Sequence, residues 1–104
     1  MLAARVLVLA SAVAAPTLTA APVFEPPQKL QAAGKVVDTE EPGYASPCLA
    51  DIDGDNVPEL LVGQFNGGKI GVHKGSRSED GKLSFGARTW LQAGGADAEI
   101  PGVW

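Results

Sequence analysis

Four acidic side chains fall within nine residues, in the segment DIDGDNVPE at positions 51–59. They occupy its first, third, fifth and ninth positions and are Asp51, Asp53, Asp55 and Glu59. Carboxylates packed this closely repel one another unless something positive lies among them. The spacing therefore predicts a cation-binding loop, and the donor atoms indicate which cation it would take.

The donors of this loop are all oxygens. A tight turn brings alternate side chains toward a common centre, and calcium takes roughly six to eight oxygen ligands. We expect Asp51, Asp53 and Asp55 to supply carboxylate oxygens, Val57 its backbone carbonyl, and Glu59 the closing carboxylate. The segment contains neither His nor Cys, which favours calcium over zinc or copper. A solvated acidic turn that binds no ion is the alternative.

The other loop residues suit a sharply bent chain. Gly54 has no Cβ, and Asn56 tolerates the left-handed region. Pro58 lacks an N–H donor, which is no loss where every ligand is an acceptor. An EF-hand would need an acid at the twelfth position and a helix on either side, but that position is Val62 and the flanks are strand-like. An EF-hand therefore fits poorly.

Short β-type runs separated by turn residues surround the loop. Asn66-Gly67-Gly68 is typical of a tight hairpin. We expect strands at residues 45–50, 59–64, 69–74 and 83–90. Four antiparallel strands in sequence form a meander, so the predicted class is all-β. Residues 21–43 read as an extended Pro/Ala-rich lead-in with one short strand at 35–37, and no clear element follows residue 90.

The apolar pattern of the strands indicates a sheet that needs neighbours. Leu60, Leu61 and Val62 are apolar in succession, whereas a sheet with one wet face alternates. One sheet cannot cover both of its own faces. The pattern predicts one unit of a stack, such as a blade among the blades of a propeller.

The first twenty residues have the pattern of a secretory signal peptide. A short positive start, MLAAR, precedes the apolar run VLVLASAVAA. Cleavage after Ala20 gives a signal of usual length, and cleavage after Ala14 has the better small-x-small pattern. An apolar N-terminal strand or anchor is the alternative, but the run is shorter than the roughly 20 residues that span a bilayer. We expect an exported protein, periplasmic, cell-surface or extracellular, with no stable membrane span after cleavage.

Composition limits the remaining possibilities. The chain has 104 residues and a net charge of −4, with 8 Lys and Arg scattered singly. This is room for one small domain and argues against a nucleic-acid partner. Cys48 is the single cysteine, so no internal disulfide can form, and we expect it to be a small buried residue. We expect His73 at the surface, and no catalytic constellation is apparent.

The two tryptophans could stack on a sugar if they were exposed. Trp90 lies near the end of the last expected strand, and we expect it in the core or at an interface between blades. Trp104 is the final residue and reads as the start of further sequence.

Residues 46–75, SPCLADIDGDNVPELLVGQFNGGKIGVHKG, resemble a repeat of the FG-GAP/VCBS kind, the unit of integrin-alpha-like β-propellers. In that family a strand enters a D-x-D-G-D-x-x-x-D/E-L loop that holds calcium, and a strand ending in V-G leaves it. The matching positions are Asp51, Asp53, Gly54, Asp55, Glu59, Leu60, Val62 and Gly63. The resemblance extends weakly to about residue 95.

The chain also departs from that family in three ways. Glu59 replaces the more usual aspartate, and Gly63-Gln64-Phe65 replaces the glycine-alanine-proline segment, which favours the VCBS-like branch. Only one acidic loop is present, whereas a propeller needs several blades. The residue patterns predict a signal peptide at 1–20 and a lead-in at 21–43, and the resemblance implies a calcium-binding blade at 44–95 and the start of a missing unit at 96–104.

With no catalytic constellation apparent, we expect a non-enzymatic function, and the resemblance implies a binding scaffold. The expected protein is an exported, calcium-binding scaffold for adhesion or for recognition of a protein or carbohydrate ligand. It would be a fragment of a longer propeller, in need of further blades or self-association. The alternatives are a non-catalytic accessory part of an exported enzyme and a truncated product with no activity of its own.

Overall fold

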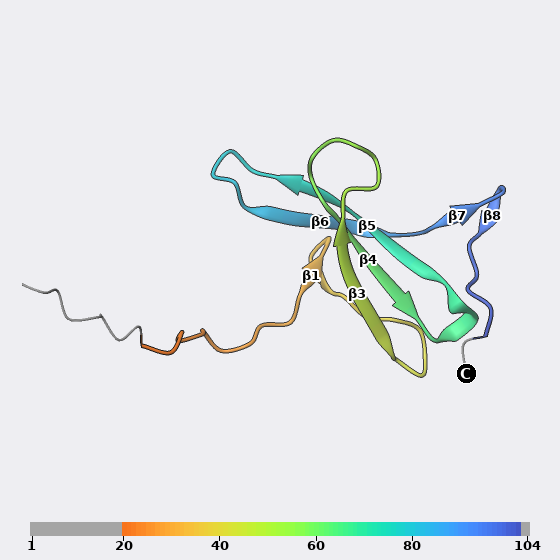
Figure 1. The fold of residues 1–104 in the computed structure, drawn as a ribbon, viewed down its shortest axis with the longest axis horizontal. Coiled ribbons are helices and arrows are strands. Elements are labelled where there is room, and N and C mark those ends of the chain that lie inside the picture. Colours follow the sequence, from red (N-terminus) through yellow and green to blue (C-terminus); the bar gives the residue numbers. More distant parts are fainter. Residues whose placement is uncertain (1–19, 103–104) are drawn as a thin grey trace, which may run out of the picture.

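The computed structural model describes residues 20–102. Trp104 and all of the predicted signal peptide except Ala20 therefore lie outside the described residues. The fold is all-β, as predicted, and is built around one four-stranded antiparallel sheet (Figure 1). The sheet contains β3 (Ala45–Ala50), β4 (Glu59–Gln64), β5 (Ile70–Arg77) and β6 (Leu83–Trp90). Their spatial order equals their sequence order, which is the predicted meander.

Three of the four central strands have the predicted bounds. The exception is β5, which begins one residue later than expected and continues to Arg77. Its extra length comes from pairing with β6, because Ser76 lies opposite Ser84 and Arg77 opposite Leu83. Residues 75–77 lie in a stretch of types that favour turns, but pairing with β6 holds them in the strand.

The turn between β4 and β5 confirms the predicted hairpin. It is a single 3-10 turn, η1 (Asn66–Gly68), in which Gly67 and Gly68 have φ values of 66° and 59°. At Gly68 a Cβ would lie 2.3 Å from the carbonyl oxygen of Ile100. This turn therefore requires glycine both for its backbone conformation and for the close approach of the C-terminal segment.

Two short hairpins flank the sheet and were not predicted as such. The strands β1 (Gln31–Ala32) and β2 (Lys35–Val36) form the first, and β7 (Gln92–Ala93) and β8 (Ala96–Asp97) form the second. The expected single strand at 35–37 is one arm of the first hairpin. Two-residue strands are too short to leave a periodic signal in the sequence.

The lead-in covers one face of the sheet. Cross-strand partners share a face, and Leu60, His73 and Arg88 are partners on this one. Ala33 N–H donates to the carbonyl oxygen of Phe85 at 2.9 Å, which attaches the first hairpin to β6. The side chains of Glu40 and Gln64 bond at 2.8 Å and close the other end. Leu60 and Val62, only 3% and 5% exposed, form the core beneath.

The opposite face is partly open. Cys48, Leu61, Val72 and Thr89 are successive partners across it. Leu61 and Val72 are half-buried, and Cys48 and Thr89 are exposed. Of the three successive apolar residues at 60–62, Leu60 and Val62 are therefore covered by the lead-in, whereas Leu61 lies on the partly open face. Within residues 20–102 no helix is long and apolar enough to cross a membrane.

Candidate metal centre

The acidic loop connects β3 to β4. Ala50, the last residue of β3, is paired with Glu59, the first residue of β4, so the two strand ends hold the loop closed at its base. The loop arches beyond the ends of these strands in Figure 1. Gly54 and Asn56 have φ values of 79° and 64°, which confirms the predicted left-handed bends at these two positions.

The carboxylates themselves shape the loop. Asp51 accepts from the backbone N–H groups of Gly54 and Asn56, each at 2.8 Å, one on each carboxylate oxygen. Asp53 accepts from Asp55 N–H at 3.2 Å. Short polar side chains stabilise turns through such bonds. Each carboxylate oxygen has two lone pairs, so an oxygen that accepts one N–H can still contact a cation.

The loop is folded around Glu59. This side chain is only 1% exposed, and its Oε2 atom accepts from the backbone N–H of Ile52 at 2.9 Å. Its other oxygen, Oε1, lies 3.1 Å from the ammonium nitrogen of Lys74. A carboxylate is rarely buried unless it is paired or coordinates a metal. The burial of Glu59 therefore fixes one anionic ligand at the base of the loop.

Three of the five predicted ligands are brought together directly. Oxygens of Asp51, Asp53 and Glu59 all lie within 4.8 Å of one another, so this cluster could hold a metal ion. Asp55 joins the group through Lys74, whose Nζ lies 2.5 Å from Asp55 Oδ2. For Val57, the structure shows its N–H donating to Asp55 Oδ1 at 2.9 Å. Its carbonyl as a ligand stays a prediction.

Lys74 was not among the predicted site residues. Its ammonium contacts Asp53, Asp55 and Glu59 together, a cation placed among carboxylates. The strand register is the signal that could have identified Lys74. Leu60 is opposite His73 in an antiparallel pair, so Glu59, which precedes Leu60, lies across from Lys74, which follows His73. Opposite charges are favoured at such a cross-strand position.

The charges of the site perturb several pKa values. The hydrogen bond from the Asn56 N–H is the main cause that lowers the pKa of Asp51. The Lys74 ammonium is the main cause that lowers the pKa of Asp53, and Asp53 and Asp55 in turn raise the pKa of Lys74. These shifts keep Asp51 and Asp53 ionised and Lys74 protonated. Four carboxylates against one ammonium leave the site negative, which suits a divalent cation.

Two other sequence predictions were wrong. Cys48 is exposed rather than buried, because it lies on the open face of β3, an edge strand. His73 is 5% exposed rather than at the surface, because its face of β5 is the one that the lead-in covers. Cys48 shares its face with Leu61 and Val72, whereas His73 is paired with Leu60 on the other, so the thiol and the imidazole lie on opposite faces.

Trp90 is half-buried at the end of β6. The guanidinium carbon of Arg88 lies 4.4 Å from the centre of its ring, and the Lys69 ammonium lies 5.2 Å from it. Both distances are in the range of cation–π contacts. The indole is thus engaged by two positive side chains of its own chain.

Comparison with known proteins adds no assignment to this geometry. No family model, curated protein or solved structure matches the chain.

Proposed function

We propose that this chain is an exported calcium-binding β-propeller repeat that serves as a structural and binding scaffold. The observation that carries the proposal is the convergence of Asp51, Asp53 and Glu59 within 4.8 Å at the junction of two strands. Calcium is the ion of choice because every donor is a hard oxygen and calcium accepts a range of ligand geometries. The proposed ligand set is completed by Asp55 and the Val57 carbonyl.

The proposed role of the ion is to hold the ends of β3 and β4 together. Lys74 already neutralises part of the carboxylate repulsion, and its side chain is 54% exposed. Its flexible stem lets the ammonium swing out when calcium enters. The single positive charge of Lys74 would then be replaced by the two positive charges of the calcium ion. We expect an affinity on the order of 0.1–1 mM, as in other extracellular modules.

Calcium titration of the full chain by calorimetry tests this proposal. Asp53→Asn removes one ligand charge but keeps an oxygen that can accept from Asp55 N–H. The matched control is Asp80→Asn, which removes one charge from the turn after β5, where Asp80 accepts from Ser78 and Lys82. We expect binding of about one ion, weakened at least tenfold by Asp53→Asn and unchanged by Asp80→Asn. No binding, or equal effects of the two variants, would refute the site.

Magnesium provides the comparison for ion identity. It demands near-octahedral geometry at shorter distances and gives up its water reluctantly. We therefore expect magnesium to bind at least about tenfold more weakly than calcium. Equal or tighter binding of magnesium would leave a metal site but contradict its assignment to calcium.

The scaffold part of the proposal draws on the open face of the sheet. Leu61 and Val72 are half-buried there, and Cys48 is exposed. We propose that further blades or a second copy cover this face, and that the assembled surface binds a protein or carbohydrate ligand without catalysis. The separation of Cys48 from His73 on opposite faces argues against a thiol–imidazole pair. Sedimentation should show self-association that Leu61→Ser weakens.

A further inference from the structure

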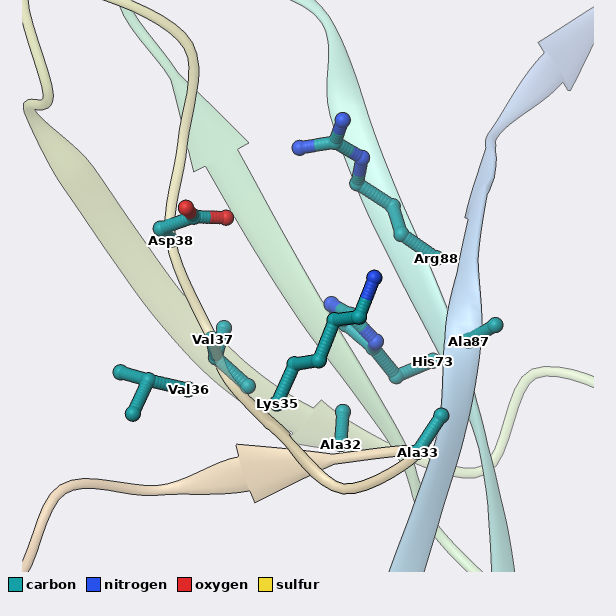
Figure 2. A pocket seen from close by; sticks show the side chains of 9 residues that line it. All are labelled: Ala32, Ala33, Lys35, Val36, Val37, Asp38, His73, Ala87 and Arg88. Carbon is teal, nitrogen blue, oxygen red and sulfur yellow. The ribbon is translucent and has the colours of Figure 1, made fainter.

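A cavity of about 470 Å³ lies between the first hairpin and the covered face of the sheet. It is separate from the acidic loop, and Figure 2 shows the side chains that line it. Small apolar residues from β1, β2 and β6 make up much of its wall, and four polar residues complete it: Lys35, Asp38, His73 and Arg88. A mainly apolar cavity with a few polar groups is the usual form of a small-molecule site.

His73 has an unsatisfied nitrogen at this cavity. Its Nδ1 lies 2.9 Å from the carbonyl oxygen of Gly86, which can only accept, so Nδ1 carries the proton and donates. In the neutral imidazole, Nε2 is then a bare acceptor. Nε2 is buried and, among the described residues, has no hydrogen-bond partner. An acceptor buried without a partner is costly, and a ligand hydroxyl would supply the missing donor.

The charges around the cavity favour an anion. Lys35 and Arg88 are positive and Asp38 is negative, and within residues 20–102 none of the three forms an ion pair. In Figure 2, the positive side chains lie on the same side as His73, and Asp38 lies on the other. Arg88 is held over the Trp90 ring at 4.4 Å, which leaves its N–H groups available. The cavity is thus net positive on a chain whose net charge is −4.

We propose that this cavity binds a small 2-hydroxycarboxylate with an apolar side group. The carboxylate would pair with Lys35 and Arg88, the adjacent hydroxyl would donate to His73 Nε2, and the apolar group would pack on Ala32 and Val37. Because Nε2 is closed to water, the ligand must displace a neighbouring group, and the exposed, flexible Lys35 is suited to move. The site would be independent of the calcium loop, since His73 and Lys74 point to opposite faces of β5.

The test uses 3-phenyllactate as the probe and the full chain at pH 8. His73 is the only histidine, so its Cε1 proton gives one assignable NMR signal at the site itself. We expect 3-phenyllactate to shift that signal saturably. Two matched probes separate the contacts: 3-phenylpropionate lacks the hydroxyl, and phenyllactamide lacks the charge. Each should bind at least about tenfold more weakly, as for loss of a hydrogen bond to a charged or buried group.

Variants locate the binding charges. Lys35→Met and Arg88→Met keep aliphatic stems but remove charge, and each should weaken 3-phenyllactate about tenfold. Lys82→Met, in the turn after β5, is the charge-matched control and should change nothing. His73→Asn retains a donor toward Gly86 but removes Nε2, so calorimetry should show equal affinities for 3-phenyllactate and 3-phenylpropionate.

The outcomes decide the proposal either way. An unshifted His73 signal would overturn it, as would equal binding of the three probes or a loss of affinity in Lys82→Met equal to that in Lys35→Met. Running the titration in calcium-saturated and calcium-free buffer separates this site from the metal centre. Binding of 3-phenyllactate without any calcium effect would support this cavity even if the calcium proposal failed.

Discussion

Gly75 couples the acidic loop to the sheet, and Gly75→Ala should disrupt both. A Cβ at this position would lie 1.9 Å from the carbonyl oxygen of Pro58, 2.9 Å from its carbonyl carbon and 3.2 Å from Cγ1 of Val57. The obstacle is mainly loop backbone, not the end of a flexible side chain. The variant must therefore separate β5 from the loop by about 1 Å, the kind of overpacking that costs about 1–3 kcal/mol.

The free energy of unfolding by urea, followed by tryptophan fluorescence, measures this cost. We expect Gly75→Ala to lose about 1–3 kcal/mol. Because Pro58 precedes Glu59, the same displacement should weaken calcium binding in calorimetry. Gly86→Ala is the matched control, since its Cβ would meet only ordinary contacts, the nearest being the carbonyl oxygen of Lys74 at 3.7 Å. Equal unfolding free energies for the two variants would refute the packing of the loop against β5.

Three further predictions follow from the site and the open face. Lys74→Met should raise calcium affinity about tenfold, because its two exposed ion pairs, with Asp53 and Asp55, and its contact with the buried Glu59 no longer compete with the ion. Calorimetry would show this, and Lys82→Met should leave the affinity unchanged. Lys74 lowers the pKa of Asp53 in the folded protein below its usual value of 3.8. The ionised Asp53 carboxylate therefore stabilises the fold above pH 3.8, and this contribution is lost as the pH falls through the lower pKa of the folded state. Carboxyl NMR of Lys74→Met should show that pKa rising toward 3.8, and an unchanged value would contradict the contact. Cys48 is exposed in the single chain, so a disulfide reagent should label it without denaturant at concentrations where sedimentation shows a monomer. Labelling of the monomer only after unfolding would contradict the open face.

Most of the central sheet could be predicted from the sequence, because strands and turns leave local patterns of residue types. The bounds of β3, β4 and β6 were predicted from runs of β-forming residues between turns, and the two left-handed residues of the loop from their types. The flanking hairpins were missed because strands of two residues have no detectable alternation. Their formation depends on contacts made in space, such as Ala33 N–H with Phe85.

The errors at Cys48 and His73 have one physical origin. Alternation along a strand separates its two faces, but it does not say which face another segment covers. The covering segment is the lead-in, which carries no periodic pattern. Lys74 was missed for a related reason, since its role depends on the register that sets it across from Glu59, and register was not assigned from the sequence.

An irregularity in the pairing of β5 with β6 connects the two proposed sites. His73 is opposite Arg88, but Gly75 is opposite Phe85, so β6 advances three residues while β5 advances two. Such a bulge frees backbone groups from the ladder and re-aims side chains. Here it includes Gly86, whose carbonyl accepts from His73, and it lies across from Lys74, whose ammonium reaches the carboxylates. Because adjacent residues of β5 point to opposite faces, this one bulge can position a side chain at each site while leaving the sites separate.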